Sequence, residues 1–309
     1  KWGAYGMLTA TLIGNIVCSL YIFFAKNIYR YINIKLYSKE LLKKLWKYSL
    51  PLIPNAISWW IFNSSDRIIV SSILGIGDNG ILSAAYKFSS VYITIYNIFN
   101  MTWTESASLH IDDKDNNKFF SKIIDTTLRL FTAICFGIIV CMPFIFPVMI
   151  NEKFGQAYNQ IPILMISSLF NVVVGLISVI YIAKKDTKAV AKTSICSAII
   201  NVVVNLALIK FVGLYAASIS TLAAYLIMSI YRMYDVRKYI KIDLNKKFVI
   251  SATVMIPIIF VCYYINNLYL NIIIILLVLV YAWLVNRKSV NLITNTIKEK
   301  FLKKGAQNG

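Results

Sequence analysis

Long apolar runs are the feature that most limits how this chain can fold. Ile, Leu, Val, Phe and Tyr gather in runs of 18 residues or more, and a helix needs about 20 such residues to cross roughly 30 Å of hydrocarbon. Only 15% of the 309 residues are charged, against about a quarter in an ordinary soluble domain. Alternating strands of about ten residues, which are typical of transmembrane barrels, do not occur in the sequence. The pattern predicts an all-α, polytopic transmembrane helix bundle.

The apolar runs and the polar residues between them predict about nine spanning helices. The first run, 5–25, lacks the cleavage site of a signal peptide, so we interpret it as a spanning helix. The chain begins at Lys1 without an initiator Met, which favours a fragment of a longer protein. The predicted helices are 5–25, 49–74, 81–104, 126–150, 161–183, 193–211, 213–234, 248–265 and 270–286.

The basic residues predict how these helices are oriented. Of the 32 lysines and arginines, 26 fall in polar segments on one side of such a bundle, whereas only Lys1, Lys153 and Lys210 fall on the other. The basic segments are 26–48, 114–122, 184–192, 232–247 and the residues after 286. Because cytoplasmic loops retain positive charge, we expect a multi-pass protein of the bacterial cytoplasmic (inner) membrane with a cytoplasmic C-terminus.

The net charge of +19 follows from these same loops. A nucleic-acid partner would require a soluble basic face, so we expect no nucleic acid and anionic membrane lipids instead. Apolar residues interleave with the lysines of 26–48. This segment is therefore a helix on the inner leaflet or a basic linker between two helical halves, and these interpretations are compatible.

Motifs for catalysis or for a cofactor do not occur in the sequence. It has no P-loop, GxGxxG, GxSxG or zinc-ligand spacing, and its five cysteines all lie in apolar runs. The one histidine, His110, lies near Asp112, Asp113 and Asp115. A solvated turn explains this cluster better than a metal site, because one imidazole with flexible carboxylates binds a metal poorly. We expect no catalytic residue, metal or cofactor, and hence no enzyme.

The second predicted helix carries ionisable residues at membrane depth. Asp66 and Arg67 lie 11 and 10 residues before Gly77, and Lys87 lies 10 residues after it on the antiparallel neighbour. At a rise of about 1.5 Å per residue, the three reach similar depth. An ionisable group there costs about 2.5–3.5 kcal/mol, so it normally faces the bundle interior or a wet cavity.

Two interpretations of these charges remain open. In the first, they form a cationic cavity wall in which Asp66 pairs with one base and the excess charge binds an anionic ligand. In the second, Asp66 and Lys87 form a structural bridge, and Arg67 extends to the outer headgroups. At Arg129, four residues after Asp125, a local helical ion pair is the default expectation.

Uncharged polar residues also recur within the predicted spans. Hydrogen bonds between helices explain most such residues, and lining of a transport pathway explains some. These residues are Asn97, Asn100, Ser167, Ser168, Asn171, Ser178, Asn201 and Asn205.

Five pieces of the sequence occur in an informative order and spacing. They are 50–61 with its two prolines and tryptophan pair, 65–70 with its Asp-Arg pair, the turn at Gly75, 84–88 and 103–105. Together they resemble the central region of polysaccharide flippases, the O-antigen and capsule repeat-unit translocases of the multidrug/oligosaccharidyl-lipid/polysaccharide exporter superfamily.

The resemblance implies a MATE-like fourteen-helix fold with two six-helix lobes and two further C-terminal helices. This chain would cover that fold from the sixth helix onward. The implied domains are the last helix of the N-terminal lobe (1–25), a basic cytoplasmic inter-lobe segment (26–48), a six-helix C-terminal lobe (49–234), two extra C-terminal helices (248–286) and a basic cytoplasmic tail (287–309).

The resemblance also implies a function. An undecaprenyl-diphosphate-linked oligosaccharide would move to the outer leaflet by alternating access, with proton or cation coupling, for surface polysaccharide export. Polysaccharide polymerase machinery is a further expected partner. By position, the expected substrate-binding residues are Arg67, Lys87, Asp66, Asn63, Trp60 and Glu105.

Three alternatives to this function remain. One is another exporter of the superfamily, either a lipid II flippase or a drug/cation antiporter, although an antiporter would favour acidic cavity residues. A second is a membrane-bound polysaccharide polymerase, which should carry a large extracytoplasmic loop; the longest such loop here is about 151–160. A third is a scaffold of a glycan-synthesis complex.

Overall fold

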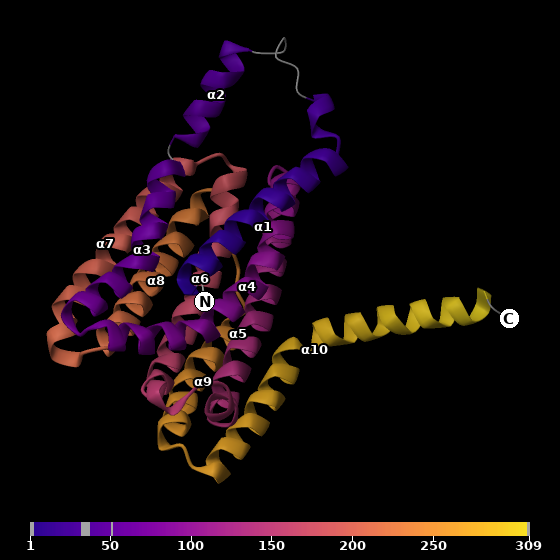
Figure 1. Ribbon diagram of the computed structural model, residues 1–309. Coiled ribbons are helices and arrows are strands. Elements are labelled where there is room, and N and C mark those ends of the chain that lie inside the picture. The colour runs from indigo at the N-terminus through magenta and orange to yellow at the C-terminus, as the bar shows by residue number, and fades with distance from the viewer. Residues whose placement is uncertain (1–2, 32–37, 51, 308–309) are drawn as a thin grey trace. The chain divides into compact units, whose positions relative to one another are not determined.

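The computed structural model describes residues 3–31, 38–50 and 52–307, and every regular element within them is a helix. The chain divides into two compact units, Lys1–Ser49 and Leu50–Gly309. Figure 1 labels the α-helices. They are α1 (Gly3–Ala25), α2 (Lys39–Ser49), α3 (Leu52–Ile73), α4 (Ile76–His110), α5 (Asn116–Met149), α6 (Ala157–Ala183), α7 (Thr187–Val212), α8 (Tyr215–Asp235), α9 (Lys246–Ile265) and α10 (Leu268–Gln307), with short 3₁₀ helices at Ile28–Tyr31, Glu152–Phe154 and Val236–Lys238.

The nine predicted spans correspond to α1 and α3–α10. Among the described residues, seven helices are long and apolar enough to cross a membrane, namely α1 and α5–α10. The helices α3 and α4 are long enough, at 22 and 35 residues, but are more polar. The chain is therefore a multi-pass membrane protein with the predicted all-α, polytopic helix bundle.

Some helices extend beyond the apolar runs that predicted them. The helix α5 begins at Asn116 rather than near 126, because Phe120 and Ile124 bury one face of the extension while Lys118 and Lys122 stay exposed on another. Hydropathy detects the apolar run, whereas an amphipathic helix continues for as long as one face packs.

In the first unit, much of the basic segment 26–48 is helical. The helix α2 places Leu41, Leu42, Leu45 and Trp46 on one face, all of them exposed, and its lysines on the opposite face. A short helix of this kind is typical of a membrane surface, which favours the surface-helix interpretation. The remaining part of the segment, 32–37, lies outside the described residues.

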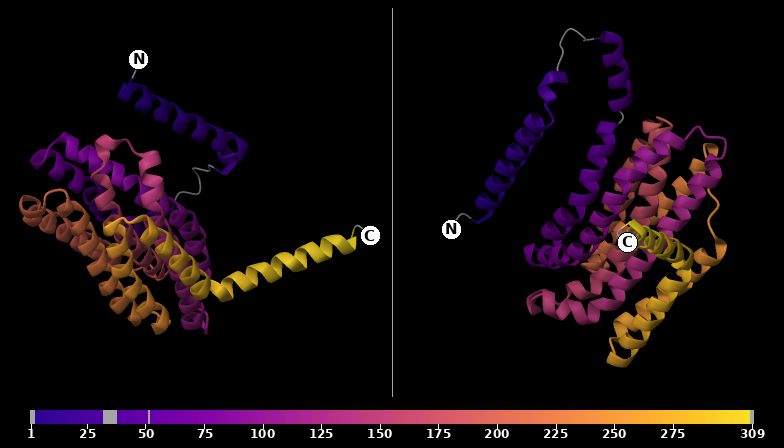
Figure 2. Two further views of the ribbon diagram at one scale, coloured as in Figure 1. Left: turned by 90° about the horizontal axis from the view of Figure 1, so that it is seen from below. Right: turned by 90° about the vertical axis from the view of Figure 1, so that its right-hand side faces the viewer.

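In the second unit, α3, α4, α6, α7 and α8 form one group of packed helices, and α5 lies against α6 (Figures 1 and 2). The contact between α4 and α6 is close because Gly175 has no side chain. A Cβ added to Gly175 would lie 2.8 Å from Cε1 of Tyr96. The indole N–H of Trp103 also donates to the carbonyl of Leu176 at 3.2 Å. These contacts hold α4 and α6 close together.

The loops meet in two groups, as the charge distribution predicts. At one end, Lys184 Nζ lies 2.6 Å from Asp112 Oδ1, and Lys238 Nζ lies 3.6 Å from Asp186 Oδ2. These contacts join the basic segments 184–192 and 232–247 to each other and to the loop at Asp112. At the other end, the rings of Tyr158 and Tyr263 stack with centroids 4.3 Å apart. Segments predicted to share a side of the membrane therefore share an end of the bundle.

One basic residue departs from this pattern. Arg232, which the sequence assigns to the cytoplasmic segment 232–247, is fully buried because α8 continues as far as Asp235. Its Nη2 donates to Thr193 Oγ1 at 2.6 Å, and its Nη1 donates to Ser178 Oγ. Arg232 therefore connects α6, α7 and α8 through neutral acceptors.

Candidate functional site: a polar pocket between four helices

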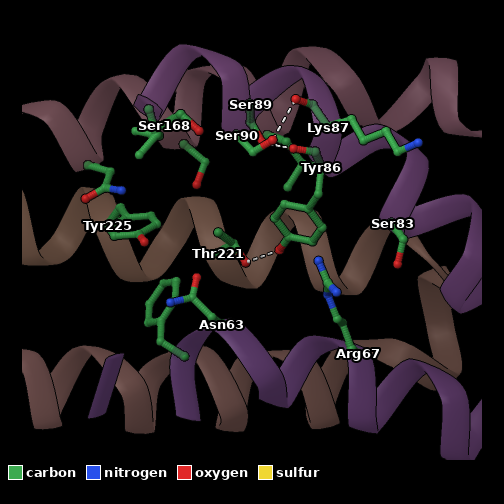
Figure 3. Close-up of a pocket in the computed structure, with 15 residues that line it drawn as sticks. Asn63, Arg67, Ser83, Tyr86, Lys87, Ser89, Ser90, Ser168, Thr221 and Tyr225 are labelled. Atoms are coloured by element: carbon green, nitrogen blue, oxygen red, sulfur yellow. Dashed lines mark hydrogen bonds between the residues drawn. The ribbon is translucent and has the colours of Figure 1, made fainter. Parts of the chain in front are cut away.

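The helices α3, α4, α6 and α8 surround a pocket of about 270 Å³ in the second unit. On α3, α4 and α6, polar lining residues lie three or four positions apart, which places them on one helix face. Figure 3 shows the pocket. Its polar lining consists of Asn63 and Arg67 from α3, Ser83, Tyr86, Lys87, Ser89 and Ser90 from α4, Ser167, Ser168 and Asn171 from α6, and Thr221 from α8.

Two cationic side chains line this pocket. Arg67 and Lys87 are both exposed residues that line the pocket, and neither forms an ion pair with another described residue. The Arg67 Cζ lies 6.0 Å from the centroid of the Tyr86 ring. Carboxylates are absent from the described lining. The pocket therefore offers two unpaired cations, and a guanidinium is well suited to phosphate or carboxylate groups.

Asp66 does not pair with a base, and both sequence-based interpretations are wrong on this point. Its side chain is 1% exposed. Its Oδ2 accepts hydrogen bonds from Tyr86 at 2.8 Å and from Thr221 at 2.6 Å, and its Oδ1 accepts one from Asn205 Nδ2 at 2.7 Å. The predicted Asp66–Lys87 bridge is absent because neutral donors from α4, α7 and α8 satisfy the carboxylate.

The polar cluster around Asp66 extends through α7. Ser65 Oγ donates to Asn201 Oδ1 at 2.9 Å, and Asn201 Nδ2 donates to Thr221 Oγ1 at 3.2 Å. The predicted interhelical hydrogen bonds of Asn201 and Asn205 are thus confirmed. The Oδ1 of Asn205 is buried without a partner among the described residues. Since Thr221 also lines the pocket, the buried carboxylate lies directly behind the pocket wall.

The other predicted contact residues lie in different places. Asn63 lines the pocket, and its Nδ2 donates to the carbonyl of Trp59 at 2.8 Å. Trp60 is 65% exposed and Glu105 is also exposed, and neither contributes to the pocket. Trp60 points elsewhere because its neighbour Trp59 occupies the inward position.

Sequence reasoning missed several residues of the site. Tyr86, Thr221 and Tyr225 contribute to its wall, yet they look like ordinary membrane residues in the sequence. A usable signal existed on α4, where Ser83, Lys87 and Ser90 recur at spacings of four and three. That spacing marks one polar helix face.

Two other polar clusters have structural explanations. The predicted Asp125–Arg129 pair is confirmed, with 2.7 Å between Oδ2 and Nε. His110 stacks on Phe119 with ring centroids 4.5 Å apart. Within the described part of the chain, no three His, Cys, Asp or Glu side chains group together as metal ligands would.

The comparisons with known proteins identify the family. A sequence model described as "Polysaccharide biosynthesis protein" matches residues 1–162 of the 309. The chain belongs to the polysaccharide biosynthesis protein family. None of the curated proteins matches the sequence.

Among solved structures, this family member is similar to "Lipid II flippase MurJ, inward closed conformation". The TM-score is 0.63 at 21% sequence identity, and the match covers 94% of this chain and 64% of that structure's chain. This chain thus spans less than two thirds of that chain's length. The fold of this chain is therefore similar to that of this solved structure.

Proposed function

We propose that this chain is part of a flippase that moves an undecaprenyl-diphosphate-linked oligosaccharide across the bacterial cytoplasmic membrane for O-antigen or capsule export. The observation that carries the proposal is that Arg67 and Lys87, two cations without an ion-pair partner among the described residues, line one pocket between α3, α4, α6 and α8. Both side chains are exposed and free to contact a ligand, and the oxygens of a diphosphate are suitable partners for a guanidinium and an ammonium group. The family description, polysaccharide biosynthesis, agrees with a glycan cargo.

The proposal assigns a role to each segment. The helix within 1–25 is the last helix of the N-terminal lobe. The segment 26–48 links the two lobes on the cytoplasmic face, and the segment 49–234, with α3–α8, forms the C-terminal lobe. The helices of 248–286 are additional, and 287–309 is a cytoplasmic tail. Rocking of one lobe against the other would expose the pocket to each side in turn. Anionic lipids and polymerase machinery are the proposed partners.

Asp66 is the proposed coupling group. It is a buried carboxylate within a transport fold, held by neutral donors, with the unpartnered Asn205 Oδ1 beside it. An ionisable residue at membrane depth is a functional group by default, because its desolvation is costly. A proton or a cation bound there would change the hydrogen bonds of Tyr86 and Thr221, which line the pocket.

Complementation tests the proposed function. The full-length gene is restored to a strain that lacks its surface-glycan flippase, with Arg67→Ala, Lys87→Ala or both. Each single variant should lower surface glycan about tenfold or more, since a hydrogen bond to a charged group contributes about 1.5–3 kcal/mol. The double variant should abolish display. Lys210→Ala, an exposed lysine outside the pocket, is the matched control and should display normally.

Normal display by the double variant, at normal protein level, would refute the role of the cationic pocket. Lipid II flipping is the second candidate function, and the fold match favours it. The full-length wild-type gene and the same variants, placed in a strain depleted of its lipid II flippase, separate the two candidates. Rescue of growth there without rescue of surface glycan would select lipid II flipping.

A further inference from the structure

We propose that two grooves on either side of α7 form a binding site for one anionic phospholipid with two acyl chains, its phosphate at Lys188 and Lys192. This site gives a location to the anionic lipids that are proposed above as partners. It rests on that part of the proposed function and not on the identity of the cargo. Three observations support it: two adjoining grooves, two lysines at their shared end, and an apolar lining whose hydroxyl groups are already satisfied.

Two grooves of the second unit lie beside α7, which packs between α3 and α8 (Figure 1). The first groove, of about 500 Å³, lies between α7 and the start of α3. The second groove, of about 200 Å³, lies between α7 and α8. Lys192 and Cys196 of α7 line both of them. The two grooves therefore adjoin each other across the surface of α7.

The shared end of the grooves carries two lysines. Lys188 and Lys192 lie four residues apart in the first two turns of α7, so they share a helix face. Both are exposed, and neither forms an ion pair with another described residue. Asp235 is close enough to Lys192 to interact with its charge, but it is already paired with Lys238 at 2.9 Å. The lysines are therefore free to bind a phosphate group.

Beyond the lysines, the lining of the grooves suits hydrocarbon. Two hydroxyl groups line the second groove, and both are satisfied within the protein. Thr193 Oγ1 accepts a hydrogen bond from Arg232 Nη2 at 2.6 Å, and Ser197 Oγ donates to the carbonyl of Ala224 at 3.2 Å. Acyl chains would therefore meet mainly apolar groups. The apolar lining includes Leu50, Pro54 and Ile195 in the first groove and Ile200, Ile227 and Met228 in the second.

The paired grooves match a lipid with two chains. A glycerophospholipid carries two acyl chains on one headgroup, so its phosphate would lie at the lysines and one chain would lie in each groove. The undecaprenyl carrier of the proposed cargo has a single chain, which would fill only one groove. Both lysines also belong to the basic segment 184–192, which is predicted to be cytoplasmic. The cytoplasmic leaflet is the one that supplies anionic lipids to such segments.

The bound lipid would hold α7 against its two neighbours. These three helices carry the carboxylate of Asp66 on α3 and two of its donors, Asn205 on α7 and Thr221 on α8. A ligand that binds only the folded protein stabilises it by mass action. Phosphatidylglycerol should therefore raise the unfolding temperature of the purified protein more than phosphatidylcholine does.

Lipid titrations of the purified full-length protein in detergent test this site, with bound lipid counted by native mass spectrometry. The probes are dioleoyl phosphatidylglycerol, dioleoyl phosphatidylcholine and the single-chain undecaprenyl phosphate. Lys188→Gln combined with Lys192→Gln should weaken phosphatidylglycerol binding about twenty-five-fold, at about fivefold per lysine, and leave phosphatidylcholine binding unchanged. Lys122→Gln combined with Lys246→Gln removes two exposed lysines outside both grooves and is the matched control, which should bind phosphatidylglycerol normally.

Cys196→Trp tests the grooves separately from the charge. Cys196 is exposed and lines both grooves, so an indole ring there would obstruct both while the lysines remain. This variant should weaken binding of phosphatidylglycerol and phosphatidylcholine alike, by about tenfold, because chain contacts are lost.

Three results would overturn the lipid site. The first is a loss of phosphatidylglycerol affinity in the Lys188/Lys192 variant that is no greater than in the control pair. The second is wild-type affinity in Cys196→Trp, and the third is undecaprenyl phosphate binding as tightly as phosphatidylglycerol. Arg67→Ala should leave phosphatidylglycerol binding unchanged, since Arg67 lines neither groove. Failure of the lipid site therefore leaves the complementation test of the cationic pocket standing, and failure of that test leaves the lipid site standing.

Discussion

Asp66 shows at the scale of single residues what a sequence can and cannot reveal. Its charge predicted an inward position, because a carboxylate facing lipid is costly, and it is buried. Its partners were not predictable. They come from residues 20, 139 and 155 positions away in the chain, and neutral hydroxyl and amide groups carry no charge that would mark them. The rotation of α7 and α8 about their axes decides which side chains reach the carboxylate.

The amide variant tests whether the charge of Asp66 is needed for transport. Asp66→Asn keeps the shape of the side chain, and hydroxyl rotation and an amide flip at Asn205 can restore the hydrogen bonds. Stability should therefore change by about 1 kcal/mol or less, a shift of roughly 2–4 °C in unfolding temperature. Surface glycan display should fall at least tenfold, because an amide carries no negative charge and does not take up a proton at this position.

Asp66→Leu is the contrasting variant. It leaves the donors of Tyr86, Thr221 and Asn205 without an acceptor, so it should lower the unfolding temperature further than Asp66→Asn does. Normal glycan display by Asp66→Asn would assign the residue a purely structural role.

At the scale of elements, hydropathy and length identified the helices but not how they are connected outside the membrane. The segment that leads to α9 is an example. Lys241 N–H donates to Asn117 Oδ1 at 2.9 Å, and Asp243 N–H donates to Ser121 Oγ at 2.9 Å. Asn245 N–H then donates to Asp125 Oδ1 at 3.1 Å.

These contacts repeat because two periods nearly match. Four residues of a helix rise about 6.0 Å, and two residues of an extended chain rise about 6.6 Å. Acceptors four apart on α5 therefore meet N–H groups two apart in the segment. The sequence shows the acceptors four apart on α5, but it does not show their partners, because backbone N–H groups of the segment, and not its side chains, form these bonds.

Hydrogen exchange tests this contact. Asn117→Ala combined with Ser121→Ala removes two acceptors, each contributing about 1 kcal/mol. Amide exchange at Lys241 and Asp243 should accelerate roughly tenfold or more, while the α4–α6 contact keeps its protection. Lys122→Ala, an exposed position on the same helix, should change nothing. Unchanged exchange in the double variant would show that packing alone holds the segment.

At the scale of the whole molecule, the charge bias and the structure give complementary information. The structure gathers the loops into two groups at opposite ends of the bundle, through Lys184–Asp112 at one end and Tyr158–Tyr263 at the other. The contacts that form these two groups are the same whichever end of the bundle faces the cytoplasm. That assignment comes from the 26 basic residues in one group of segments, through the preference of cytoplasmic loops for positive charge.

Cysteine labelling in intact cells tests the orientation. The five native cysteines are first replaced, and a single cysteine is then introduced as Gln156→Cys or Asp113→Cys, both exposed positions in loops at opposite ends of the bundle. A membrane-impermeant maleimide should modify Gln156→Cys in intact cells, because that loop belongs to the end poor in basic residues. It should modify Asp113→Cys only after permeabilisation, because moving that loop outward would carry its basic neighbours across the membrane. The reverse labelling pattern would show that the bundle has the opposite orientation, with the basic segments and the C-terminal tail outside the cell.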